Sequence, residues 1–182
     1  HNAMTAKEYT CYYAKVQDRD LPMAVDVLAD MFTSSLIDPQ EFETERGVIL
    51  EELAMADDDP ADVTSERFFE AVLGEHPLGR PIGGNPATIT AVSREAVVEH
   101  YRANYRAQDL VITAAGAVDH DVLVAGVVAA LERAGWDLGA EARPVERRDA
   151  THDLIERGSP LVVVNRPIEQ ANLIAGVVGI AA

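Results

Sequence analysis

The sequence predicts an α+β fold in which a mixed antiparallel sheet carries a layer of helices. Apolar residues recur with helical spacing through the middle of the chain, and strand-like apolar runs occur toward its ends. Strands and helices do not alternate regularly, as they do in a parallel βαβ fold. The 182 residues suffice for one domain, or for one domain and the start of another.

The first half of the chain is expected to combine a strand with three helices. Residues 8–17 are rich in Tyr, Thr and Val, which favour a strand. A helix is expected after Asp20-Leu21-Pro22, because Asp and Pro are typical of a helix start. Asp38-Pro39 and Asp59-Pro60 predict two further helices, the first of them running to about residue 57.

The second half is expected to hold two helices and three strands. Residues 74–86 contain several Gly and Pro residues and are predicted to be a loop. Ser93 is expected to cap a fourth helix, and residues 119–135 are expected to form a fifth. The polar segment 140–160 is predicted to be a linker. Three apolar runs are predicted to be strands: 110–118, 161–165 and 171–180.

The composition disfavours several function classes. A formal net charge of −16 repels phosphate backbones and anionic lipids, so neither a nucleic-acid partner nor a membrane partner is expected. The single cysteine, Cys11, excludes an internal disulfide and is interpreted as a small core residue rather than a reactive thiol. Only two of the fifteen basic residues are lysines, and no signal peptide is visible. We therefore expect a bacterial protein of the cytoplasm.

The helix expected at 39–57 carries carboxylates near its apolar residues. Four residues form its apolar stripe: Phe42, Ile49, Leu53 and Ala56. Glu45 and Glu52 fall within this stripe, whereas Glu51 points toward solvent. Buried carboxylates cost free energy unless they are paired, protonated or bound to a metal. From this pattern alone, a place at the rim of the fold, or neutralisation by Arg46 or another arginine, is favoured over a metal site.

Four short motifs occur in order along the chain. They are the Asn-Ala-x-Thr-x-x-Glu-x-Thr run from Asn2 to Thr10, the Glu-Arg-x-x-x-x-x-Glu run from Glu45 to Glu52, His76-Pro77-Leu78-Gly79, and Gln170-Ala171-Asn172-Leu173. Together they resemble the pitrilysin/insulinase/mitochondrial processing peptidase superfamily of inverted-motif zinc peptidases, over nearly the whole chain. The alternative is an unrelated α+β domain with chance matches.

The resemblance implies a fold like the half-domain of mitochondrial processing peptidase, with zinc as cofactor. In that family two histidines of a His-x-x-Glu-His helix bind zinc, its glutamate activates water, and a downstream glutamate is the third ligand. By position Glu52 is that ligand, and Glu45 matches a supporting glutamate that orients a ligand histidine. Asn2 and Ala3 match the edge strand to which the substrate peptide adds. The resemblance implies a structural role for His76.

None of the five histidines stands in a His-x-x-Glu-His motif, so the chain carries one zinc ligand and no general base. We therefore expect a fragment that is inactive alone, from a zinc metalloendopeptidase. Residues 1–140 are expected to be the C-terminal part of the first peptidase domain, 141–160 a linker, and 161–182 the first strands of the next domain.

The resemblance also implies the partners. The substrate is a peptide or unfolded polypeptide, enclosed between this half and a second homologous half or subunit, and a homodimer fits the same scheme. The alternative is a non-peptidase subunit of the superfamily that has lost the zinc motif and only binds peptide or forms the chamber wall. The presence of both Glu45 and Glu52 argues against this alternative. Asn2-Ala3 could also be a remnant of an expression vector, which would remove the edge-strand assignment.

Overall fold

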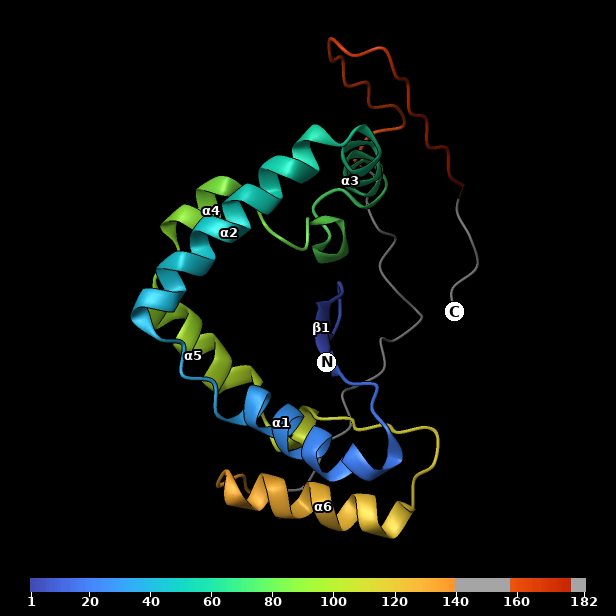
Figure 1. Ribbon diagram of the computed structural model, residues 1–182. Helices are drawn as coiled ribbons and strands as arrows, with labels where there is room; N and C mark the ends of the chain where they lie inside the picture. Colours follow the sequence, from blue (N-terminus) through green and yellow to red (C-terminus); the bar gives the residue numbers. More distant parts are fainter. Residues whose placement is uncertain (140–157, 178–182) are drawn as a thin grey trace. The chain divides into compact units, whose positions relative to one another are not determined.

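The computed structural model describes residues 1–139 and 158–177. They form two units: residues 1–39 with 93–139, and residues 40–92 with 158–177 (Figure 1). The linker predicted at 141–160 falls almost entirely outside the described residues, as do residues 178–180 of the last predicted strand. The predicted domain boundaries therefore stay a prediction.

The first unit begins with a two-stranded antiparallel sheet. Strand β1 (Asn2–Thr5) pairs with strand β2 (Thr10–Tyr13), so that Ala3 lies opposite Tyr12. The strand predicted over 8–17 is shorter than expected, because it ends where its pairing with the four residues of β1 ends. All four residues of β1 are exposed.

Three helices complete this unit: α1 (Leu21–Thr33), α5 (Arg94–Asn104) and α6 (His120–Arg133). Their starts agree with the sequence analysis. The Ser93 hydroxyl caps α5 by accepting from the Ala96 N–H, and the Asp119 carboxylate caps α6 by accepting from the Val122 N–H. Asp20 precedes α1 without such a bond.

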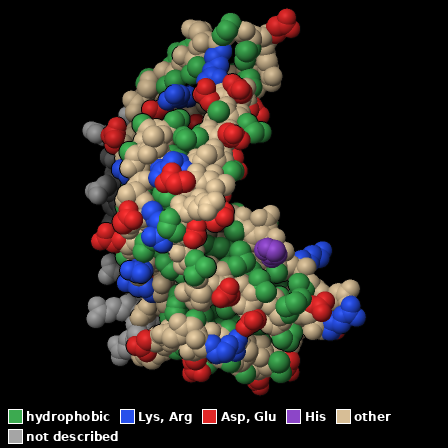
Figure 2. Space-filling model, turned by 60° about the vertical axis from the view of Figure 1, so that its left-hand side comes forward, with side chains coloured by type: hydrophobic (Ala, Val, Ile, Leu, Met, Phe, Trp, Pro, Cys, Tyr) green, Lys and Arg blue, Asp and Glu red, His purple; other side chains and the backbone are tan. Residues whose placement is uncertain are grey.

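Helices α1 and α6 lie side by side (Figure 1) and carry the buried apolar side chains of this unit. Among the described residues, the buried apolar positions are Ala24, Ala29, Ala130 and Leu131. Many large apolar side chains remain exposed, and Figure 2 shows them interspersed with charged ones. Within the described ranges, none of the helices has the length and apolar character needed to cross a bilayer.

Aromatic contacts attach the hairpin to the helices of the first unit. The Tyr12 ring lies 6.3 Å from Phe32 of α1, and the Tyr12 hydroxyl lies 3.3 Å from the Tyr105 hydroxyl. Tyr101 donates to the Phe32 carbonyl at 2.7 Å. Burial and the bond to Tyr105 raise the pKa of Tyr12 well above its ordinary value, so its hydroxyl stays protonated.

The second unit contains α2 (Pro39–Asp58), α3 (Pro60–Leu73) and α4 (Pro86–Ala91). The starts of α2 and α3 agree with the sequence analysis, and the Asp59 carboxylate caps α3 through the Ala61 N–H at 2.7 Å. Helix α4 lies where the sequence analysis predicts no helix, directly after the Gly- and Pro-containing segment that it predicts to be a loop. Short 3₁₀ turns occur at Asp18–Asp20, Pro77–Gly79 and Ala107–Asp109.

The strands predicted at 110–118, 161–165 and 171–180 do not form in the described residues. A strand needs a neighbour for its N–H and C=O groups, and the described part of the chain supplies none at these places. Val111 is 83% exposed and Leu173 is 90% exposed, which agrees with the missing neighbour. The predicted mixed sheet is thus reduced to the β1–β2 hairpin, in a mostly helical α+β chain.

Candidate functional site

Helix α2 carries the two glutamates that the sequence analysis marked. Its half-buried residues are Phe42, Arg46, Ile49, Leu50, Leu53 and Ala56, which includes the whole predicted stripe. At about 100° per residue, Glu45 and Glu52 lie roughly 70° and 90° from the centre of this face, on one flank. Both are exposed, as is Glu51 on the opposite side.

The exposure of Glu45 and Glu52 agrees with one of the favoured alternatives, a place at the rim of the fold, and corrects only their place within the apolar stripe. Arg46 and Leu50 are half-buried as well, so the centre of the covered face of α2 lies farther from the two glutamates than the stripe predicts. The free-energy cost of burying two carboxylates does not arise in this structure. Glu51 and Glu52 are both exposed, so they differ in the direction in which they project from α2 and not in burial.

The described residues offer no partner to these carboxylates. No hydrogen bond or ion pair to the side chain of Glu45 or Glu52 occurs within 1–139 and 158–177. Arg46 forms its ion pair with Glu43 at 3.0 Å, so it does not neutralise the two marked glutamates. The hydrogen bond from Arg46 lowers the pKa of Glu43.

A catalytic zinc ion needs three protein ligands, and α2 can offer one of them. Glu52 offers a free carboxylate, which is a ligand type that zinc accepts. Among the described residues no three His, Cys, Asp or Glu side chains lie close enough together to hold a metal. The described residues can therefore supply one zinc ligand, Glu52, and not a complete zinc site.

The outer edge of β1 presents main-chain groups. The hairpin turn is closed by a bond from the Ala6 N–H to the Tyr9 carbonyl at 2.8 Å. Hydrogen-bonded and non-hydrogen-bonded pairs alternate along an antiparallel ladder, so Met4 directs its N–H and C=O toward β2. Ala3 and Thr5 direct theirs away from β2, toward an edge that no described residue pairs with.

Asn2 takes part in this edge through its side chain. Its Oδ1 accepts the Ala3 N–H at 2.8 Å. This bond agrees with the direction that the alternation of the ladder gives the Ala3 N–H. A strand that adds to this edge would take over that donor from the Asn2 side chain.

The His76-Pro77-Leu78-Gly79 motif forms a tight turn. The Nδ1 atom of His76 accepts the Leu78 N–H at 3.2 Å and caps the turn. Gly79 is buried, and a Cβ atom there would lie 3.1 Å from the Gly74 carbonyl oxygen. These contacts support the structural interpretation of His76.

Residues 1–86 match the family model described as Insulinase (Peptidase family M16). The matched range includes the β1 edge, the α2 glutamates and the His76 turn.

The chain belongs to the insulinase family.

Several relatives of this insulinase-family chain are named as zinc proteases. An uncharacterized zinc protease of Streptomyces coelicolor is 43% identical over 180 residues, covering 99% of this chain and 39% of the relative. One of Mycobacterium tuberculosis is 42% identical, covering 97% and 39%. The β subunit of the mitochondrial-processing peptidase of Saccharomyces cerevisiae is 38% identical, covering 68% and 27%. The chain thus spans at most 39% of the length of these relatives.

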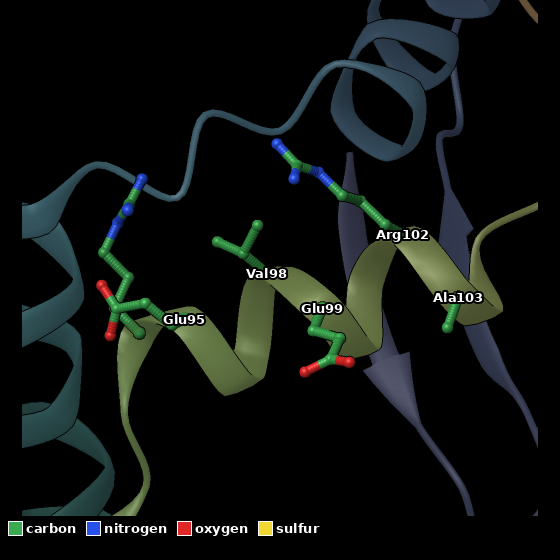
Figure 3. Close-up of a pocket in the computed structure, with 6 residues that line it drawn as sticks. Glu95, Val98, Glu99, Arg102 and Ala103 are labelled. Atoms are coloured by element: carbon green, nitrogen blue, oxygen red, sulfur yellow. The ribbon is translucent and has the colours of Figure 1, made fainter.

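The insulinase-family chain also has a pocket that the sequence analysis did not mark. It has a volume of about 590 Å³ and is lined by one helix, α5, through Arg94, Glu95, Val98, Glu99, Arg102 and Ala103. Figure 3 shows Val98 and Arg102 extending from one side of α5 and Glu99 from the other. Charges of both signs line this pocket, and none of the predicted site residues lies in it.

Proposed function

We propose that this chain is a segment of a zinc metalloendopeptidase of the inverted-motif type, in which Glu52 supplies the third zinc ligand. The observation that carries the proposal is the exposed Glu52 carboxylate, which has no partner among the described residues of an insulinase-family chain. The two ligand histidines and the general base belong to a part of the longer protein that this sequence does not include. Bound zinc would polarise the scissile carbonyl and activate water.

Glu45 is proposed to support the site. It lies two turns before Glu52 and within about 20° of it around α2, so both carboxylates project from the same flank. A carboxylate in this place can accept the second ring N–H of a ligand histidine and hold the imidazole in one orientation.

The β1 edge is proposed to hold the substrate. Ala3 and Thr5 direct main-chain groups outward, and a peptide that pairs with them is bound through groups that every residue has. Such binding suits an enzyme that accepts unfolded polypeptides of many sequences. We also propose a half-domain fold with a larger sheet, and a second homologous half or subunit that encloses the peptide.

Glu45→Gln in the longer protein is expected to leave zinc bound and to lower turnover by about ten- to a hundredfold, the range typical of groups that orient a ligand. Glutamine keeps the shape of the side chain but removes its charge. Zinc content by atomic emission and kcat on a fluorogenic peptide measure the two effects. Turnover equal to that of the unaltered protein would reduce Glu45 to a surface residue.

The proposed activity is tested with the longer protein and the 182-residue chain, purified side by side. The longer protein should hold one zinc ion and cleave unfolded peptides, and a chelator should abolish cleavage. The chain alone should bind zinc weakly and cleave nothing, because it supplies one ligand where three are needed. Peptide binding without cleavage by the zinc-loaded longer protein would favour the non-peptidase subunit instead.

A further inference from the structure

The side chain of Arg46 crosses from α2 to the C-terminal end of α4. Its Nη2 donates to the Val92 carbonyl at 2.8 Å, and its Nη1 donates to the carbonyls of Thr90, at 3.3 Å, and Ile89. The side chain is only 15% exposed. The guanidinium group of Arg46 thus donates hydrogen bonds to three main-chain carbonyls within the segment 89–92.

These contacts complete a helix that is short. Helix α4 has six residues, and a helix of that length has little stability of its own. Its first turn is capped by Asn85 and Thr88, each side chain bonding the other residue's N–H. Its last carbonyls have no partner within the helix, and Arg46 supplies both hydrogen bonds and a positive charge there.

Arg46 is also held firmly on its own helix. Its Nε donates to Glu43 Oε2 at 3.0 Å, and its Nη2 lies 3.3 Å from Glu43 Oε1. The guanidinium carbon lies 4.8 Å from the centre of the Phe42 ring. The charge is therefore fixed between α2 and α4 rather than free in solvent.

The contact with α4 determines which flank of α2 stays open. Arg46 lies roughly 100° around the helix from Glu45 and 120° from Glu52. A second contact lies next to Glu52 in the sequence: Leu53 packs so closely on the loop before α4 that a Cβ atom on Gly83 would lie 3.1 Å from its Cδ2. The two contacts oppose rotation of α2 about its axis.

We propose that Arg46 is a positioning residue for the Glu52 carboxylate. By binding the end of α4, Arg46 fixes the rotation of α2 about its axis. The flank of α2 that carries Glu45 and Glu52 then stays uncovered and keeps one direction. This inference rests on the proposed role of Glu52 as a zinc ligand. Arg46 acts through the orientation of α2, because its own polar contacts are with Glu43 and α4. A ligand must be held within about 0.5 Å of its productive position, so a small rotation suffices to weaken the site.

The test compares Arg46→Gln and Arg46→Lys in the longer protein. The readouts are the zinc dissociation constant, from competition with a chromogenic chelator, and the unfolding temperature of the zinc-free protein. Arg46→Gln is expected to weaken zinc binding about tenfold. Arg46→Lys should fall between it and the unaltered protein, since an ammonium cannot span the three carbonyls as a planar guanidinium does.

Two control variants separate positioning from general loss of stability. Arg67→Gln removes an arginine whose ion pair with Glu70 is exposed, and it should change neither readout. Asp59→Ala removes the cap of α3, so it should lower the unfolding temperature while zinc affinity stays unchanged.

The outcomes distinguish this inference from the proposed function. If Arg46→Gln keeps its zinc affinity while Glu52→Gln loses zinc, the positioning role of Arg46 is overturned and the proposed ligand stands. Zinc retained by Glu52→Gln would instead overturn the proposed ligand. If Arg46→Gln does not fold, Arg46→Lys decides: it keeps the charge and the long stem, and unchanged affinity in it contradicts the inference.

Discussion

Glu52→Gln in the longer protein is expected to remove most of the bound zinc and to reduce peptide hydrolysis by more than about a hundredfold, beyond the range seen when only a supporting group is lost. Glutamine has the same shape as glutamate but no negative charge, and a neutral amide is a poor zinc ligand. Zinc content, zinc affinity and kcat/KM on a fluorogenic peptide measure the effect.

Glu51→Gln is the matched control for that experiment. It makes the same chemical change one residue earlier, at a side chain that is also exposed. Glu51 lies roughly 100° around α2 from Glu52, on the side opposite the covered face. Zinc content and activity should therefore stay near those of the unaltered protein. Equal losses in both variants would show that the ligand-bearing flank of α2 is misassigned.

Ala3→Pro in the longer protein is expected to raise KM for peptide substrates about three- to tenfold without displacing zinc. Proline has no N–H, so it removes a main-chain donor that points away from β2, and one such hydrogen bond contributes about 0.5–1.5 kcal/mol. The zinc content is expected to stay unchanged, because Ala3 is not a metal ligand. Initial rates over a range of peptide concentrations separate KM from kcat.

Two neighbouring variants sharpen this experiment. Ala3→Gly keeps the N–H and should leave KM nearly unchanged. Met4→Pro removes a donor that points toward β2, so it should disrupt the hairpin and lower the unfolding temperature. An unchanged KM in Ala3→Pro, or a peptide found bound elsewhere in a structure of the complex, would contradict the edge-strand proposal.

Local chemistry explains why the longer helices were predicted well. Asp59, Ser93 and Asp119 each cap the helix that follows through an N–H two or three residues away. Such contacts depend only on neighbours in the sequence, so residue type and spacing reveal them. Asn85-Pro86, with Thr88 after it, carries the same signal for α4 and was missed because the flanking glycines and prolines indicated a loop.

The strands show the opposite case. The run 110–118 has a strand-like composition, yet a strand exists only where another segment pairs with it. The spacing of apolar residues indicates which secondary structure a segment favours, but it does not indicate which other segment it pairs with. β1 and β2 formed because a two-residue turn at Lys7 and Glu8 brings them together.

The order of the family motifs and the spacing of Glu45 and Glu52 can be read from the residues alone, and that spacing puts both carboxylates on one side of α2. The regular geometry of a helix makes that placement a matter of local spacing. The covered side of α2 depends on contacts with distant segments, among them the bonds from Arg46 to carbonyls more than forty residues later. No periodicity within α2 encodes a contact with so distant a segment, so the sequence leaves a place at the rim and neutralisation by an arginine as alternatives, and the fold shows both glutamates exposed.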